Sequence, residues 1–148
     1  MQTMLYALAF TAGLVLTVQV GVNATLRACL GNPVMAALTS FLVGLVGLGL
    51  FLVLTRASLP AKAALSAVPL WAWAGGLLGA FYVASTIIVG PRLGAAALLA
   101  LSVLGQLLAS LVVDHFGWLG FPQHAISLPR LAGAVLLFAG VLLIVRVG

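Results

Sequence analysis

The sequence predicts an all-α membrane protein with five transmembrane helices in a small-residue-rich bundle, and three observations predict it. First, 65% of the 148 residues are hydrophobic and only 5% are charged, whereas an ordinary soluble domain is about a quarter charged. Second, five apolar segments approach the roughly 20 residues that a helix needs to cross a bilayer. Third, turn-forming glycine, asparagine and proline separate several of these segments. A soluble fold of this length could not cover such a core with so few charged side chains.

The five predicted helices form a single transmembrane domain over residues 1–148. They run over residues 4–27, 34–54, 70–89, 94–113 and 131–145, each bound being approximate. The last is the shortest, and either helical residues before Arg130 or a tilt of the neighbouring helices would complete its span.

Proline and glycine justify most of these bounds. Asn32-Pro33 opens the second helix, and Gly90-Pro91 is predicted to close the third in a tight turn. Ser127 and the Leu-Pro-Arg that follows it are typical of a cap and first turn, which places the start of the fifth helix there.

Small residues recur at helical spacing in three of the helices. They are the pairs Ser40 and Gly44, Gly75 and Gly79, and Gly133 and Gly140. Such residues let helix backbones approach closely in lipid, either within one chain or across a dimer interface.

The basic residues are scattered singly near helix ends, so they do not form a nucleic-acid interface, although the formal net charge is +5. Arg56, Lys62 and Arg130 fall on one predicted side of the membrane; Arg27, Arg92 and Arg146 fall on the other. Three against three gives no positive-inside bias. The balance predicts dual topology and an antiparallel homodimer; the alternative is one orientation set by other features.

Two polar stripes lie on the predicted helices at spacings of four or eight residues, which keep side chains on one face. Helix one carries Thr11, Gln19, Asn23 and Arg27, and helix four carries Ser102, Gln106, Ser110 and Asp114. Gln19, Asn23 and Gln106 are predicted to line a substrate pathway, because buried carboxamides need partners and a wet cavity supplies them. The alternative is that they only join helices through hydrogen bonds.

Helix three and the end of helix four supply the remaining candidate site residues. Tyr82, with Ser85 nearby, could present an aromatic face to a substrate or simply pack with its hydroxyl on one partner. Asp114 is the single acidic residue. It is either a proton or cation handle, or a helix-end residue paired with Arg130 or with an arginine of an inverted partner.

Several residue patterns are absent from the sequence. No carboxylate lies in the middle of a predicted span, which argues against proton-coupled export of cations and leaves neutral or anionic solutes. His115 and His124 lack further ligands for a metal site. No nucleophile motif or phosphate-binding loop occurs, so neither an enzyme nor a cofactor is predicted.

Segments along nearly the whole chain resemble the YdcZ-like family of the drug/metabolite transporter superfamily. They are QVGVNATLR at 19–27, GNP at 31–33, SFLVG at 40–44, WAGGLLG at 73–79, PRLG at 91–94, and GQ at 105–106 with DHFG at 114–117. The resemblance implies a five-helix protein of the bacterial inner membrane, with dual-topology homodimers among its relatives. Small multidrug exporters of the superfamily carry a carboxylate in the first helix, where this chain has Gln19 and Asn23.

These patterns together predict a transporter of a small neutral or anionic solute that works by alternating access. Its predicted partners are the lipid bilayer, the solute and a second, inverted copy. The alternatives are a membrane scaffold, a small subunit of a larger complex, or a narrow channel.

Overall fold

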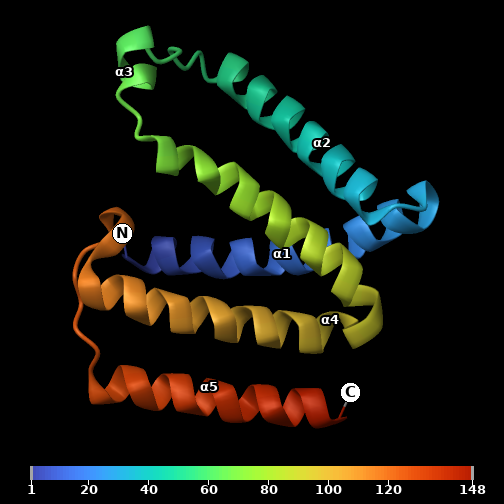
Figure 1. The fold of residues 1–148 in the computed structure, drawn as a ribbon, viewed down its shortest axis with the longest axis vertical. Helices are drawn as coiled ribbons and strands as arrows, with labels where there is room; N and C mark the ends of the chain where they lie inside the picture. Colours follow the sequence, from blue (N-terminus) through green and yellow to red (C-terminus); the bar gives the residue numbers. More distant parts are fainter. Residues whose placement is uncertain (1, 148) are drawn as a thin grey trace. The chain divides into compact units, whose positions relative to one another are not determined.

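The computed structural model describes residues 2–147, and in this range it contains helices and no strand (Figure 1). The elements are α1 (Gln2–Leu30), α2 (Pro33–Leu54), α3 (Lys62–Ser66), η1 (Leu70–Trp73), α4 (Ala74–Phe116), η2 (Trp118–Gly120) and α5 (Leu128–Val147). Four apolar helical stretches are long enough to cross a membrane, Gln2–Leu30, Pro33–Leu54, Leu70–Phe116 and Leu128–Arg146. The predicted all-α membrane fold is confirmed.

The long helix α4 contains a break at Gly94, where φ is 77° and ψ is 161°. At 43 residues, α4 would extend roughly 65 Å if it were straight, about twice the hydrocarbon thickness of a bilayer. The break divides it into two pieces of transmembrane length, which accounts for five predicted spans within four continuous stretches. The prediction that Gly90-Pro91 closes the third helix is wrong, because the helix continues through Pro91 and its dihedral angles depart from helical values only at Gly94.

The start of α2 follows the predicted turn chemistry. Asn32 is the N-cap, and its side-chain Oδ1 accepts hydrogen bonds from the backbone N–H groups of Val34 (2.8 Å) and Met35 (3.2 Å). Pro33 occupies the first helical position, where its missing N–H costs nothing. The sharp turn between α1 and α2 is therefore locally encoded.

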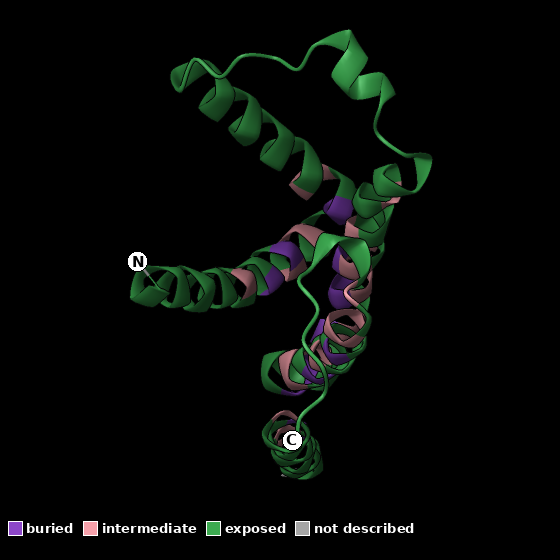
Figure 2. Ribbon diagram, turned by 90° about the vertical axis from the view of Figure 1, so that its left-hand side faces the viewer, coloured by how far each residue is buried: buried purple, intermediate pink, exposed green. Residues whose placement is uncertain are grey.

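The chain divides into two compact units, and the first is Met1–Pro91. Its core is a small cluster of Ala36 and Ala37 from α2 with Val83 and Ile87 from α4. Figure 2 shows that the buried residues of α1 and α2 gather toward the turn that joins them, whereas the rest of these helices is exposed. The exposed apolar surfaces are the faces that lipid or other helices would cover.

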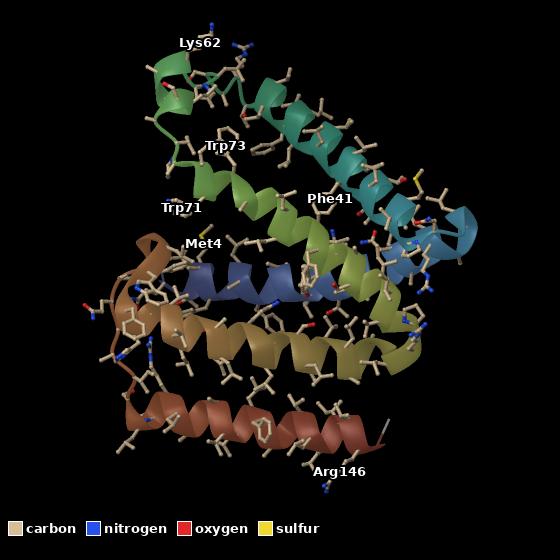
Figure 3. All side chains as sticks on the ribbon, in the orientation of Figure 1. Met4, Phe41, Lys62, Trp71, Trp73 and Arg146 are labelled. Atoms are coloured by element: carbon tan, nitrogen blue, oxygen red, sulfur yellow. The ribbon has the colours of Figure 1, made fainter. Side chains whose placement is uncertain are left out.

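One glycine of the predicted GxxxG pair takes part in packing within this unit. Phe41 projects from α2 toward the first part of α4 (Figure 3), and a methyl group added to Gly79 would lie 3.8 Å from its ring. At that distance the added methyl group would make an ordinary van der Waals contact, so this packing does not itself require glycine at position 79.

The second unit, Arg92–Gly148, contains the second part of α4 and helix α5. Helix α5 begins at Leu128, three residues before the approximate predicted bound of 131. The additional residues bring the helix to 20 residues, which is long enough to cross a bilayer. The segment between the helices is tied back to α4, because the backbone N–H of His124 donates to the carbonyl of Asp114 at 2.8 Å. This loop thus has a defined conformation at the end of the helix pair.

Candidate functional site

Two neighbouring open cavities in the first unit are lined by polar residues of the predicted helix-one stripe. The first, of about 350 Å³, lies among α1, α2 and α4, and the second, of about 630 Å³, lies between α1 and α2. Gln19 and Ser40 line both cavities, and Asn23 lines the larger one. The other lining residues are mainly apolar, and none of those found within residues 2–147 is charged.

Asn23 is the most deeply buried polar residue at this site, with 2% of its surface exposed. Its carboxamide has no hydrogen-bond partner among the described residues 2–147. Its amide atoms are not among the fully buried, unpaired side-chain atoms of the described chain, so they retain some accessible surface, and Asn23 lines the larger cavity. Such a group is expected where a solute or water supplies the missing bonds.

Tyr82 lies on α4 against the core cluster of the same unit. Its hydroxyl oxygen is buried and has no hydrogen-bond partner within the described part of the chain. The predicted alternative was a packed tyrosine whose hydroxyl has one partner. Tyr82 is packed, but its hydroxyl has no partner among the described residues. Ser85 is half-buried one turn further along α4.

Arg27 ends the helix-one stripe, and its guanidinium bonds to the backbone of α4. Its Nη1 donates to the carbonyl of Ile87 at 2.8 Å and lies 3.4 Å from that of Ile88. The side chain is half-buried. In this conformation Arg27 binds backbone oxygens, and it does not line either cavity.

The helix-four stripe belongs to the second unit. Gln106 is exposed there, and the Ser110 hydroxyl donates to the carbonyl of Leu107, on its own helix, at 2.8 Å. Arg130 Nη1 lies 3.3 Å from Asp114 Oδ2 and also donates to the carbonyl of His124. Both charged residues line a cavity of about 310 Å³ between α4 and α5. Asp114 is therefore paired with Arg130 of its own chain, and this pair was one of the partners predicted for it as a helix-end residue.

The two histidines of the following loop take part in local hydrogen bonds. His115 Nδ1 accepts from the backbone N–H of Ile126 at 3.3 Å, and His124 Nδ1 lies 3.0 Å from the carbonyl of Pro122. Among the described residues, no group of three or more potential ligands could hold a metal ion.

The sequence did not identify two contributors to the site. Ser40 was noted only as a small residue beside Gly44, although its spacing places it on the face of α2 that lines both cavities. The carbonyl of Ile87 carries no sequence signal of its own. A proline four residues later, at Pro91, is the feature that could have indicated it.

The comparisons with known proteins agree with this fold. Residues 4–143 match the family described as "Putative inner membrane exporter, YdcZ". The chain belongs to the YdcZ family. It is also 31% identical over 145 residues to "Inner membrane protein YdcZ" of Escherichia coli (strain K12), a match that covers 98% of this chain and 97% of that protein. No solved structure matches the chain significantly.

Membership of the YdcZ family and the apolar helices together give a multi-pass protein of the inner membrane. The family description also indicates export as the general role, without a substrate or a mechanism.

Proposed function

We propose that this YdcZ family member is a transporter that moves a small uncharged solute across the inner membrane by alternating access. The observation that carries the proposal is the Asn23 carboxamide, which is buried, has no partner among the described residues, and lies beside a cavity that Gln19 and Ser40 also line. Gln19, Asn23 and Tyr82 would donate and accept hydrogen bonds to the solute. Ser85 would extend this pathway along α4 of the same unit, and Gln106 remains a separate candidate of the second unit.

The residues that line the two cavities favour an uncharged solute over an anionic one, which the sequence analysis also allowed. A charged solute would need an opposite charge or water in a site surrounded by lipid, and the residues lining these two cavities within 2–147 carry no charge. Arg27, the nearest cation on the stripe, is already bonded to the carbonyl of Ile87. The expected solute has an apolar body and an amide or hydroxyl that both donates and accepts.

The proposed assembly is an antiparallel homodimer. Its support is the balance of basic residues between the two sides of the membrane, three on each, because even one additional charge can decide the topology of such a chain. Two inverted copies would generate the symmetry that larger transporters obtain from inverted repeats, with a site near the midplane.

Efflux from liposomes tests the transport proposal without a guessed substrate. Purified protein is reconstituted into liposomes loaded with the small-molecule extract of bacterial cytosol, and released solutes are identified by mass spectrometry. We expect protein-dependent, saturable release of one or a few uncharged solutes, with at least a tenfold loss for Asn23→Ala. Release that does not saturate would indicate a channel. No protein-dependent release would indicate a scaffold or a subunit.

Cysteine labelling in intact cells tests the dimer. Cys29 is replaced, and single cysteines are placed in the loop 56–69 or at the C-terminus. Labelling of each site from both sides of the membrane in comparable amounts supports dual topology. Labelling of each site from one side only rules out the inverted homodimer.

A further inference from the structure

Pro91 lies inside the helical part of α4, and this leaves one carbonyl without its normal partner. In an α-helix the N–H of each residue donates to the carbonyl four residues earlier. Proline has no N–H, so position 91 cannot donate to the carbonyl of Ile87. Ile87 is itself among the most buried residues of the unit, and an unpaired carbonyl in lipid or in a protein core is costly.

Arg27 supplies the missing donor. Its Nη1 lies 2.8 Å from the Ile87 oxygen, and the second contact, to the Ile88 oxygen at 3.4 Å, involves the next carbonyl of the same helix. We propose that Arg27 is a positioning residue that replaces the hydrogen bond removed by Pro91. It would thereby hold the end of α1 against the first part of α4.

The position of this bond relates it to the candidate site, and this step rests on the proposed function. Arg27 lies four residues after Asn23, one helical turn along the same face of α1. Ile87 lies one turn after Val83, which lines the smaller cavity, and near Tyr82 on α4. The Arg27–Ile87 bond therefore joins the two helices that carry the unpaired carboxamide and the unpaired hydroxyl.

A second role for Arg27, attraction of an anionic solute, makes a different prediction. If Arg27 serves only as a positive charge, restoring an N–H at position 91 cannot compensate for its loss. If it replaces the proline's missing bond, Pro91→Ala returns the intrahelical donor and makes Arg27 dispensable for stability.

The experiment compares wild-type protein with Arg27→Gln, Pro91→Ala and the double variant, by apparent melting temperature in detergent. We expect Arg27→Gln to lower it by about 5 °C, from the loss of a charge-assisted hydrogen bond between a half-buried guanidinium and the carbonyl of a buried residue. Pro91→Ala should not lower the melting temperature, and the double variant should melt within about 2 °C of Pro91→Ala alone. If Arg27→Gln does not accumulate in cells, recovery of the double variant is the corresponding measurement.

Arg92 provides the matched control, because it is an exposed arginine beside Pro91. Arg92→Gln should leave the melting temperature unchanged, and its effect should simply add to that of Pro91→Ala. Equal losses for Arg27→Gln with and without Pro91→Ala would overturn the proposal. So would an unchanged melting temperature for Arg27→Gln.

Flux through liposomes separates this proposal from that of transport. Rescue of both stability and flux in the double variant supports the positioning role at the solute site. Rescue of stability with no protein-dependent flux in any variant, wild type included, leaves the bond established and refutes the transport function. Rescue of stability without rescue of flux, when wild type transports, refutes a purely positioning role.

Discussion

Replacing Asn23 with leucine is expected to stabilise the protein and abolish transport. Leucine resembles asparagine in branching and removes both the donor and the acceptor from a position that is 2% exposed. If this carboxamide is kept for a solute, the empty protein bears the cost of burying it. Function and stability should then respond in opposite directions, as they do at many active sites.

The burial of the side chain sets the magnitude. An amide that is fully buried without a partner costs about 1–3 kcal/mol; the Asn23 amide reaches a cavity, so removing it should stabilise the empty protein by about 1 kcal/mol, the low end of that range. For a chain of this size, each kcal/mol raises the melting temperature by roughly 2–4 °C. We therefore expect an increase of about 2–4 °C for Asn23→Leu, reduced if the larger side chain strains its neighbours.

The assay follows tryptophan fluorescence of the detergent-solubilised protein during heating, since Trp71, Trp73 and Trp118 report on both units. Flux is measured on the same variant in liposomes. Gln19→Leu is the matched control, because Gln19 lines the same cavity but is exposed. It should lower flux without raising the melting temperature.

One pattern of results would refute this reasoning. A lower melting temperature for Asn23→Leu, together with flux close to that of wild type, would mean that the carboxamide is a packing group whose partners stabilise the fold. Lower values of both would indicate a hydrogen bond to another part of the assembly, as the helix-joining alternative requires.

Two further predictions concern the break in α4 and the ion pair in the second unit. Gly94→Ala should destabilise the protein by about 1–3 kcal/mol, measured by thermal unfolding, because a side chain is strained at φ 77° and ψ 161°; an unchanged melting temperature would show that this backbone conformation is not required. Asp114→Asn should cost no more than about 1 kcal/mol, since the Asp114 and Arg130 side chains are 26% and 36% exposed. That cost should shrink in 1 M salt, and a loss of several kcal/mol that salt does not change would contradict the surface-pair description.

Composition and turn residues made most of the fold predictable. The apolar segments defined the helices, because lipid admits no unpaired backbone and leaves helix as the available structure for such a run. Asn32 and Pro33 defined the start of α2 through chemistry that is local to the turn. Helix α5 begins at Leu128, directly after Ser127, where the sequence predicted the cap and first turn, and three residues before the approximate bound of 131.

The candidate site was only partly predictable, because periodicity identifies a shared face and not what that face contacts. The spacing correctly placed Gln19 and Asn23 together on one cavity. It could not distinguish Arg27 from them, although Arg27 reaches a backbone carbonyl of α4 instead. That distinction depends on a contact between residues 60 positions apart in the chain.

The error at Pro91 has the same physical origin. Proline usually ends a helix because its missing N–H leaves a carbonyl without a partner and its ring crowds the preceding turn. The local sequence gives no donor for that carbonyl, so termination at Gly90-Pro91 was the reasonable prediction. In the folded chain Arg27 of α1 provides the donor, and α4 continues to Gly94, where glycine permits the break. Local rules missed the role of Arg27 because it depends on a tertiary hydrogen bond, and they put the break a few residues too early because the residue with non-helical dihedral angles is Gly94.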